Sequence, residues 1–289
     1  MTSAAEKASV LIKALPYLQR FRGKTFLIKM GGSAMDDPAL VREVMRDIVF
    51  LEVAGIRPVI VHGGGKAISA AMNESGLEAK FIGGLRVTSS EAITIVDQTL
   101  HGVINQGLVE TINEFGGKAT SIHGTSVFAA KQLFGTDENG EQVNIGRVGQ
   151  VTECRTEDVL YALSAGLAPV ISPLGRHEET TETHNINADL AAAALACALK
   201  PAKLVYLSDV PGLLRDAADE TSLIESVSGR EAKELIDDGT ISGGMIPKIT
   251  SALEALASGV EKVHFIDGRT PHTLLLEIFT QSGIGTEIR

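Results

Sequence analysis

Residues 24–66 read KTFLIKMGGSAMDDPALVREVMRDIVFLEVAGIRPVIVHGGGK, and this stretch decides the fold class. The apolar run at 24–30 predicts a buried strand, 38–54 has the apolar spacing of a helix and ends at Gly55, and 57–61 predicts a second strand. A strand, a helix and a strand in this order predict two parallel strands joined by a crossover helix. The chain therefore begins as an α/β protein with a mainly parallel sheet.

The same alternation continues along the rest of the chain. Further strands are expected at 119–122, 168–171, 203–207 and 262–266, and further helices at 66–75, 91–115, 156–165, 188–199, 230–237, 248–258 and 274–280. Residues 127–152 predict β-hairpins at a sheet edge, around the turn at 137–140. The polar stretch 173–183 is typical of a linker, so we expect two α/β lobes, 23–176 and 177–289.

The composition narrows the classes of protein. With 26 Lys and Arg against 36 Asp and Glu, the net charge of −10 disfavours a nucleic-acid binder, which needs a basic surface. Two widely separated cysteines, Cys154 and Cys197, predict neither a disulfide framework nor a zinc site, and no other metal site is indicated. No run of about 18 apolar residues and no signal peptide is found, so a cytoplasmic protein without membrane contact is expected.

Residues 1–22 precede the first predicted strand and form an amphipathic helix. Its apolar stripe follows helical spacing, through Val10, Leu11, Ala14, Leu15, Leu18 and Phe21. Such a stripe needs a surface to cover. Two interpretations stay open: a helix that packs on its own domain, or an arm that docks on another subunit for oligomerisation or regulation.

Three predicted strands end in a glycine-containing segment, at KMGG (29–32), VHGGG (61–65) and SDVPG (208–212). In an open parallel sheet, ligands bind where strands end, because backbone N–H groups and helix N-termini converge there on an anion. The fingerprints G-x-x-x-x-G-K-[ST] and G-x-G-x-x-G are both missing. The glycines therefore indicate an anion site that is neither a P-loop nor an ordinary dinucleotide site.

Charged residues beside these glycines suggest phosphoryl transfer. Lys29 ends an otherwise apolar strand, and Lys248 follows Gly243 and Gly244 at a predicted helix start. Asp189 could orient both lysines by ion pairing. Stabilisation of the moving phosphoryl group needs lysines and backbone N–H groups but no covalent nucleophile.

Other polar residues suggest how a substrate is held. Arg86 follows a glycine-rich turn and is the best candidate to clamp a carboxylate, although a structural salt bridge is the alternative. Asn185 and Asn187 could bind a substrate carboxylate or amide, or merely cap the helix that follows. His62 is interpreted as a turn-stabilising residue and not as a base.

These motifs together resemble the amino acid kinase family. KMGG, VHGGG, GLRVT (84–88), NINAD (185–189), SDVPG, GGMIPK (243–248) and FIDGR (265–269) occur in the family's order over nearly the whole chain. The resemblance implies a three-layer αβα sandwich with two lobes. The first lobe would bind an amino-acid substrate and form dimers, and the second would bind ATP with Mg²⁺ carried by the nucleotide. Within the family the motifs are most similar to the branch that phosphorylates N-acetyl-L-glutamate to N-acetyl-L-glutamyl 5-phosphate in arginine biosynthesis.

The resemblance also implies roles for single residues. Lys29 and Lys248 would stabilise the transition state and Asp189 would organise them. The expected substrate contacts are Gly64, Gly65, Arg86, Asn185 and Asn187. The expected nucleotide contacts are Gly31, Gly32, Asp209, Gly243, Gly244 and Lys248.

The helix before the first strand is similar to that of the hexameric, arginine-inhibited members of the family. It implies a homohexamer, a trimer of dimers, with L-arginine bound near Tyr17, His264, Glu277 and Gly283. A PII-type signalling protein is a further conceivable partner. Three rival functions stay open: a kinase of the same fold for aspartate, glutamate or carbamate; a catalytically silent arginine-sensing module; and, more remotely, a nicotinamide dehydrogenase.

Overall fold

The computed structural model describes residues 4–280 and 283–289. Residues 1–3 of the expected 1–22 segment, and residues 281–282 directly before Gly283, therefore lie outside the described residues. Its centre is one eight-stranded sheet of order β12-β14-β13-β11-β1-β2-β8-β5. The strands are β1 (Thr25–Met30), β2 (Arg57–His62), β5 (Ala119–Ile122), β8 (Ala168–Ile171), β11 (Lys203–Ser208), β12 (Ser226–Val227), β13 (Lys262–Asp267) and β14 (Thr286–Ile288). Strand β14 pairs antiparallel with β13, and the other neighbours pair in parallel. The predicted α/β class with a mainly parallel sheet is confirmed.

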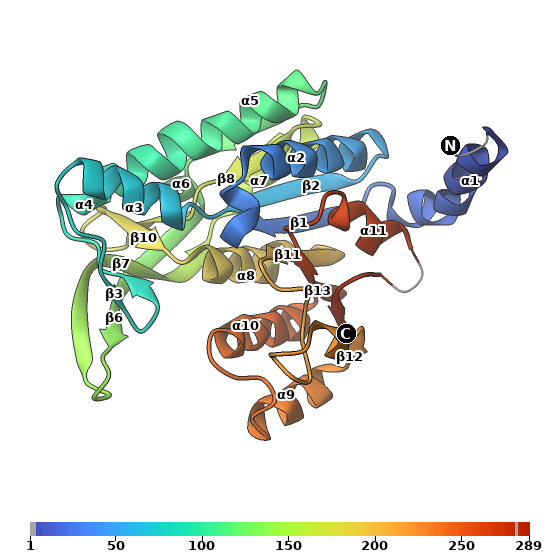
Figure 1. The fold of residues 1–289 in the computed structure, drawn as a ribbon. Helices are drawn as coiled ribbons and strands as arrows, with labels where there is room; N and C mark the ends of the chain where they lie inside the picture. The colour runs from blue at the N-terminus through green and yellow to red at the C-terminus, as the bar shows by residue number, and fades with distance from the viewer. Residues whose placement is uncertain (1–3, 281–282) are drawn as a thin grey trace.

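Helices cover both faces of this sheet, which gives three layers (Figure 1). One face packs on α2 (Pro38–Val53), α5 (Gln106–Glu114) and α11 (Thr273–Phe279), and the other on α7 (Glu157–Ser164), α8 (Ala188–Leu199) and α10 (Met245–Ser258). Strand β1 shows why: Phe26, Ile28 and Met30 enter the first core, whereas Leu27 enters the second. By the same alternation Lys29 faces the layer of α8 and α10.

The two predicted halves share this sheet. Strands β1 and β11 are direct neighbours, with Lys29 in register with Tyr206. Strands β2, β8 and β5 lie on one side of this pair, and β13, β14 and β12 on the other. The junction between the halves therefore runs down the middle of a continuous sheet.

A second, small sheet corrects two expectations. Strands β6 (Phe128–Thr136), β7 (Gln142–Cys154), β9 (Leu174–His177) and β10 (Thr183–Ile186) close on one another apart from the central sheet. The predicted hairpin forms, but it is not at an edge of the central sheet. The linker prediction for 173–183 is wrong, because β9 and the start of β10 lie in that stretch as paired strands of the small sheet, and Leu174 is buried. Most of its polar residues lie in the exposed segment 178–182 that joins the two strands.

The long helix expected at 91–115 is interrupted. It runs as α4 (Ala92–Asp97), a π-helix η2 (Gln98–Asn105) and then α5. Leu100 and Ile104 of η2 pack so tightly on Gly64 that a Cβ on this glycine would collide with both. π-Helical turns are rare and are often found at functional sites.

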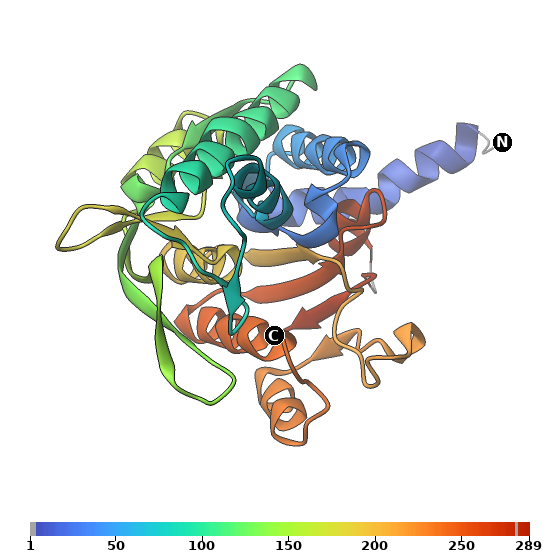
Figure 2. The same ribbon diagram turned by 60° about the vertical axis from the view of Figure 1, so that its left-hand side comes forward.

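The remaining elements are short or peripheral (Figure 2). They are α3 (Gly65–Glu74), the β3 (Phe81–Ile82) and β4 (Leu85–Arg86) pair, α6 (Gly124–Val127), α9 (Gly229–Asp237), and the 3-10 turns η1 (Gly32–Met35) and η3 (Glu220–Ser222). The predicted helix around Lys248 begins three residues earlier, at Met245. In the part of the chain that the structure describes, no helix is long and apolar enough to cross a membrane.

Helix α1 (Ala4–Phe21) agrees in part with the first interpretation of the N-terminal segment, and docking on another subunit stays a prediction. The C-terminal end of the helix packs on the body of the molecule, since Phe21 is buried. The rings of Tyr17 and Phe279 also meet edge-on, with their centroids 6.4 Å apart. Its first turns stand away from the rest of the chain (Figure 1), and their apolar side chains are 44–69% exposed: Val10, Leu11, Ile12 and Leu15.

Candidate functional site

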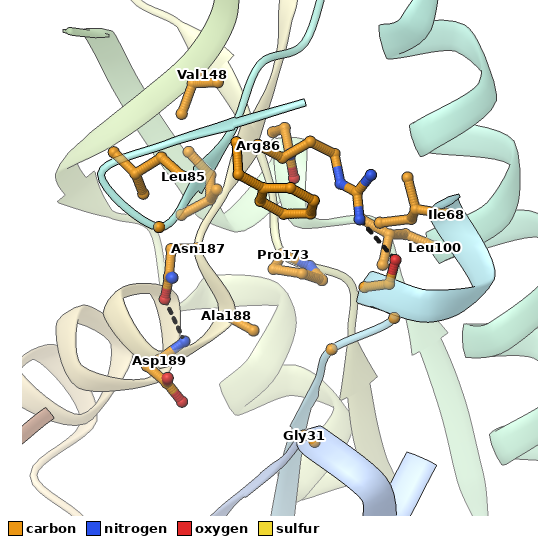
Figure 3. A pocket seen from close by; sticks show the side chains of 18 of the residues that line it. Gly31, Ile68, Leu85, Arg86, Leu100, Val148, Pro173, Asn187, Ala188 and Asp189 are labelled. Atoms are coloured by element: carbon orange, nitrogen blue, oxygen red, sulfur yellow. Dashed lines mark hydrogen bonds between the residues drawn. The ribbon is translucent and has the colours of Figure 1, made fainter. Parts of the chain in front are cut away.

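A cavity of about 230 Å³ lies at the carboxyl ends of β1 and β2 (Figure 3). Its wall contains all three glycines of VHGGG, both glycines of KMGG, and the side chains of Lys29, Arg86, Asn185, Asn187 and Asp189. Apolar side chains complete it, among them Ile68, Leu85, Leu100 and Val148. The structure thus gathers into one hollow the expected substrate residues and one of the two expected catalytic lysines.

Lys29 and Asp189 form an ion pair on the floor of this cavity. The Nζ of Lys29 lies 2.6 Å from Oδ1 of Asp189, and the two side chains are 8% and 19% exposed. Asp189 stands in the first turn of α8, where the positive end of the helix dipole stabilises a carboxylate. A Cβ on Gly31 would overlap Nζ of Lys29, so only glycine lets the ammonium lie against this backbone.

Arg86 lies on the opposite wall, in β4, and is only 7% exposed. Its Nη2 donates to the backbone oxygen of Gly65 at 2.6 Å and to Oγ of Ser69 at 2.9 Å. Burial lowers the pKa of the guanidinium. The alternative of a structural salt bridge is not formed: among the described residues no carboxylate pairs with Arg86. Its charge is therefore available to an anionic ligand.

The two asparagines differ in their contacts. Asn187 caps α8, since its Oδ1 accepts from the N–H groups of Asp189 at 2.8 Å and Leu190 at 3.2 Å. Figure 3 shows this side chain turned back toward the helix. Asn185 donates to Oγ1 of Thr88 at 3.3 Å. The capping interpretation thus describes Asn187, and Asn185 presents an amide to the cavity.

His62 fills the structural role predicted for it. It is fully buried, its Nδ1 lies 2.9 Å from the backbone oxygen of Gly63, and its Nε2 lies 3.1 Å from Nδ2 of Asn105. Nδ1 donates and Nε2 accepts in this arrangement, so the ring is neutral. Burial lowers its pKa to about 4. The histidine holds the turn before the three glycines in place.

The remaining expected nucleotide residues lie outside this cavity. Lys248 is half-buried in the first turn of α10, the helix that packs along α8, and no ion pair joins it to Asp189 within the described chain. Gly243 and Gly244 precede it in an exposed turn. Asp209 borders Gly32, on which a Cβ would lie 3.3 Å from the carboxyl carbon of Asp209.

A second cavity, of about 400 Å³, opens at the other ends of β11 and β13. Tyr17, His264, Glu277 and Gly283, the four residues expected at an effector site, all line it. They come from α1, β13, α11 and the segment before β14. The predicted residues, far apart in the sequence, are therefore brought together.

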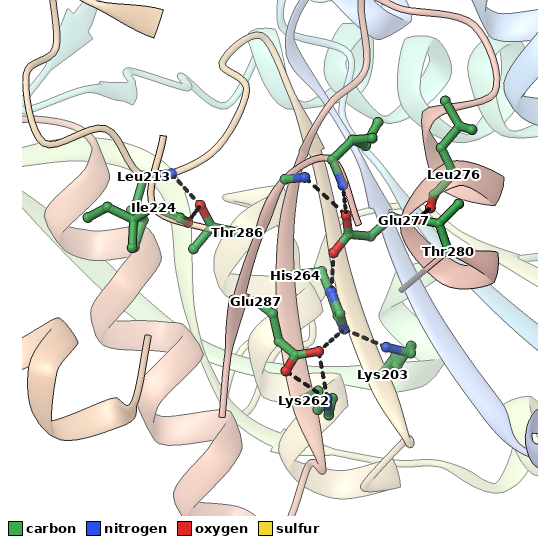
Figure 4. Close-up of polar contacts among 12 residues, drawn as sticks. Lys203, Leu213, Ile224, Lys262, His264, Leu276, Glu277, Thr280, Thr286 and Glu287 are labelled. Carbon is green, nitrogen blue, oxygen red and sulfur yellow. Dashed lines mark hydrogen bonds and ion pairs between the residues drawn. The ribbon is translucent and has the colours of Figure 1, made fainter. Parts of the chain in front are cut away.

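A series of buried and half-buried polar contacts forms the floor of this second cavity (Figure 4). Nζ of Lys203 lies 2.6 Å from Nε2 of His264, whose Nδ1 lies 2.6 Å from Oε1 of Glu277. Nζ of Lys262 contacts both carboxylate oxygens of Glu287 at 2.6 Å. Burial lowers the pKa of Lys203 to about 8 and also lowers the pKa of His264, so the imidazole is neutral and accepts from the lysine.

Sequence reasoning missed several residues of both cavities. The second cavity is also lined by Lys203, Lys262 and Glu287. The sequence feature that could have predicted them is a charged residue beside or within an apolar strand. Ser69 and Phe81 contact Arg86. Gly83 and Gly84, with φ of 55° and 76°, form the two-residue turn that places Phe81 opposite Arg86, and a glycine pair between two apolar residues is a recognisable hairpin signal.

Comparison with known proteins agrees with this fold and these motifs. Residues 24–267 match the model of the amino acid kinase family. The acetylglutamate kinase of Akkermansia muciniphila is 60% identical over the whole chain and 97% of its own length, and that of Methanocaldococcus jannaschii is 45% identical over the whole chain and 98% of its length. The structure of N-acetylglutamate synthase from Neisseria gonorrhoeae superposes with a TM-score of 0.84 at 27% identity, over 97% of this chain and 63% of the synthase.

The parallel sheet with glycine-rich strand ends and the lysine–aspartate pair, taken together with these relatives, place the chain among phosphotransferases without a P-loop. The chain belongs to the amino acid kinase family, and its curated relatives are acetylglutamate kinases.

Proposed function

We propose that this chain transfers the γ-phosphoryl group of ATP to the side-chain carboxylate of N-acetyl-L-glutamate. The observation that carries the proposal is the pairing of two sites across one cavity, the Lys29–Asp189 ion pair and the buried Arg86. The substrate has two carboxylates. Arg86 would hold one of them while the other reacts beside Lys29.

In the proposed reaction an oxygen of the side-chain carboxylate attacks the γ-phosphorus of ATP. A new P–O bond forms, the bond between the γ-phosphorus and the bridging oxygen to the β-phosphate breaks, and ADP leaves with that electron pair. The products are ADP and N-acetyl-L-glutamyl 5-phosphate. Lys29 stabilises negative charge on the transferred group, and Asp189 fixes the position of its ammonium.

The nucleotide is proposed to bind beside Gly31, Gly32 and Asp209 and at the start of α10, with Gly243, Gly244 and Lys248. A helix N-terminus presents free backbone N–H groups to phosphates. Within the described residues, no cluster of three or more His, Cys, Asp or Glu side chains could hold a metal ion. Mg²⁺ would therefore be bound mainly by the triphosphate, where it neutralises phosphate charge.

A coupled assay of ADP release tests the choice of substrate. It compares N-acetyl-L-glutamate, L-glutamate, L-aspartate and carbamate, each with ATP and Mg²⁺. We expect the highest kcat/KM with N-acetyl-L-glutamate, since Asn185 and Arg86 supply an amide and a cation to an N-acylated amino acid. Equal or greater turnover with free glutamate would refute the proposed substrate.

The variant Lys248→Ala tests catalysis against the rival of a silent sensing module. Loss of one preorganised cation from a phosphoryl-transfer site should lower kcat by about 100-fold or more, with the melting temperature retained. Lys233→Ala, at an exposed position of α9, is the matched control. A kcat for Lys248→Ala equal to that of the control would favour the silent module.

We further propose that L-arginine inhibits the enzyme from the second cavity, in a hexamer built as a trimer of dimers. The cavity contains carboxylates (Glu277, Glu287) and cations (Lys203, Lys262), a suitable set for an amino acid that carries charges of both signs. The exposed apolar stripe of α1 supports docking on a second copy of the chain. Repeating the assay with added arginine tests the inhibition.

A further inference from the structure

The guanidinium of Arg86 is held on two sides by residues that the catalytic motifs do not include. Phe81 covers one face of it, and Ser69 contacts its edge. Both contacts come from outside the GLRVT motif, from β3 and from α3 respectively. They decide how Arg86 is presented to the cavity.

Ser69 fixes the rotation of the guanidinium within its plane. Its hydroxyl donates to the backbone oxygen of Gly65 at 3.0 Å, which directs an oxygen lone pair toward Arg86. The two hydrogens of Nη2 then reach Ser69 Oγ at 2.9 Å and Gly65 O at 2.6 Å. With Nη2 committed to two acceptors in fixed directions, the orientation of the group is defined before any ligand arrives.

Phe81 fixes the tilt of the guanidinium and shields it from water. The carbon Cζ of Arg86 lies 4.7 Å from the centre of the Phe81 ring, and the two residues are paired in register across the β3–β4 turn. Phe81 is 56% exposed while Arg86 is 7% exposed. An aromatic ring left this open to solvent gains little from its own burial, so covering the cation is its evident contribution.

The electrostatics of the site require such a cover. The charge of Arg86 is desolvated, and among the described residues no carboxylate neutralises it, so neutral oxygens and the ring face compensate for the lost water. A carboxylate partner from the protein would have compensated more strongly but would have competed with the ligand.

We propose that Phe81 and Ser69 are positioning residues that hold Arg86 ready for the unreacting carboxylate of the substrate. This inference rests on the proposed function, because it assigns that carboxylate to Arg86. Phe81 and Ser69 act through Arg86, so their loss should weaken binding of the acid and leave phosphoryl transfer to the bound acid intact.

Steady-state kinetics of Phe81→Leu and Phe81→Tyr test the proposal. Leucine keeps an apolar side chain but has no ring, so the KM for N-acetyl-L-glutamate should rise about tenfold, while kcat and the KM for ATP stay within about twofold. Tyrosine keeps the ring and should restore a KM near that of the wild type. Ser69→Ala should raise the same KM several-fold, and Ser69→Thr, which keeps the hydroxyl, should rescue it.

Phe134→Leu is the matched control, since Phe134 is 48% exposed on β6 and does not line the cavity. A wild-type chain that phosphorylates none of the acids would overturn the proposed function itself. With an active wild type, three results would overturn the positioning role: a Phe81→Leu enzyme identical to the control, a Phe81→Tyr enzyme as impaired as Phe81→Leu, or an equal rise in the KM for ATP.

Discussion

His62 occupies the last position of β2, directly before the three glycines that line the cavity. Its side chain is completely buried, and both ring nitrogens are engaged, by Gly63 O and by Asn105 Nδ2. Asn105 is the last residue of the π-helix and also donates to Val170 O at 3.0 Å. A single neutral imidazole thus joins the glycine turn to η2, and Asn105 extends this link to β8.

This burial predicts a pH dependence of stability. The folded pKa of His62 is about 4 and that of the unfolded chain 6.5, so between these values the unfolded state binds a proton that the folded state does not. The contribution of neutral, buried His62 to the free energy of unfolding is present in full above pH 6.5. It is lost as the pH falls toward 4, and the total loss is about 3 kcal/mol.

Urea unfolding of the wild type and of His62→Gln at pH 7.5, 6.5, 5.5 and 4.5 measures this. Glutamine can accept from Asn105 but does not titrate. The difference in unfolding free energy between wild type and variant should shrink as the pH falls below 6.5. A difference that stays constant across the series would show that His62 does not titrate with unfolding.

Single residues in strands were the most predictable part of the site. Lys29 and His62 could be placed at strand ends from the local pattern of apolar residues alone. The three glycines after His62 could be predicted to border the ligand site. The partners of Arg86 could not be placed so easily, because Ser69 is 17 residues away and the contact depends on how α3 packs against β4. Asn187 could be read as a cap or as a ligand, and only the geometry distinguishes the two.

At the scale of elements, a hydrogen bond joins α2 to His272, the residue directly before α11. Nδ1 of His272 lies 2.7 Å from Oδ1 of Asp47, and its Nε2 lies 3.5 Å from Oε2 of Glu43. Asp47 is 1% exposed, and burial raises its pKa to about 6 even though the contact with His272 opposes this. His272 has a positive φ of 63°, unusual for a residue with a side chain.

Loss of this contact should be destabilising. In His272→Asn the new side chain tolerates the backbone conformation, but Asp47 is left buried beside Glu43 without its partner. We expect the free energy of unfolding to fall by about 2 kcal/mol. The effect is smaller than for a fully buried pair because His272 is half exposed, so solvent screens the contact. The measurement is urea unfolding at pH 7.5.

The double variant His272→Asn/Asp47→Asn is the control for coupling between the two helices. It removes the unpaired charge as well, so it should be more stable than His272→Asn alone if the two side chains interact. Additive effects of the two substitutions would mean that the contact contributes nothing to the packing of α11 on α2.

Helices and strands could be predicted where a local sequence pattern determines them. The predictions failed where contacts between distant segments determine the structure. Six of the eight strands of the central sheet and most helices have the expected positions, whereas the short strands β12 and β14 were not predicted. The four-stranded closed sheet was not foreseen, because β9 and β10 obtain their stability from pairing with β6 and β7, and their own sequence is as polar as that of a linker. The π-helix was missed for a similar reason, since it follows from close packing on Gly64.

At the scale of the whole molecule, the two cavities lie at opposite ends of the strands of one sheet. The first opens at the carboxyl end of β1. The second opens at the amino ends of β11, which pairs in parallel with β1, and of β13, which pairs in parallel with β11. Helix α1 reaches the second cavity through Tyr17 and Phe21, its first turns extend away from the body (Figure 1), and its apolar stripe is exposed. Helix α1 would therefore take part both in assembly of the hexamer and in binding of the effector.

Deletion of residues 1–20 should separate catalysis from both proposed properties. The Lys29–Asp189 pair and Arg86 are untouched, so turnover should persist. The hexamer should fall to dimers in sedimentation velocity, and inhibition by arginine should disappear with Tyr17. A deleted chain that stays hexameric and inhibited would refute the role of α1.

The double variant Leu11→Glu/Leu15→Glu distinguishes the two properties. These side chains are one helical turn apart on the exposed stripe, whereas Tyr17 and Phe21 stay in place on the body. Charges on the stripe should prevent docking and give dimers, because each carboxylate would be buried without a partner. If arginine inhibits only the assembled hexamer, these dimers should bind arginine without being inhibited. If it acts within one chain, inhibition should survive, and a titration of activity against arginine, with sedimentation of the same samples, decides between them.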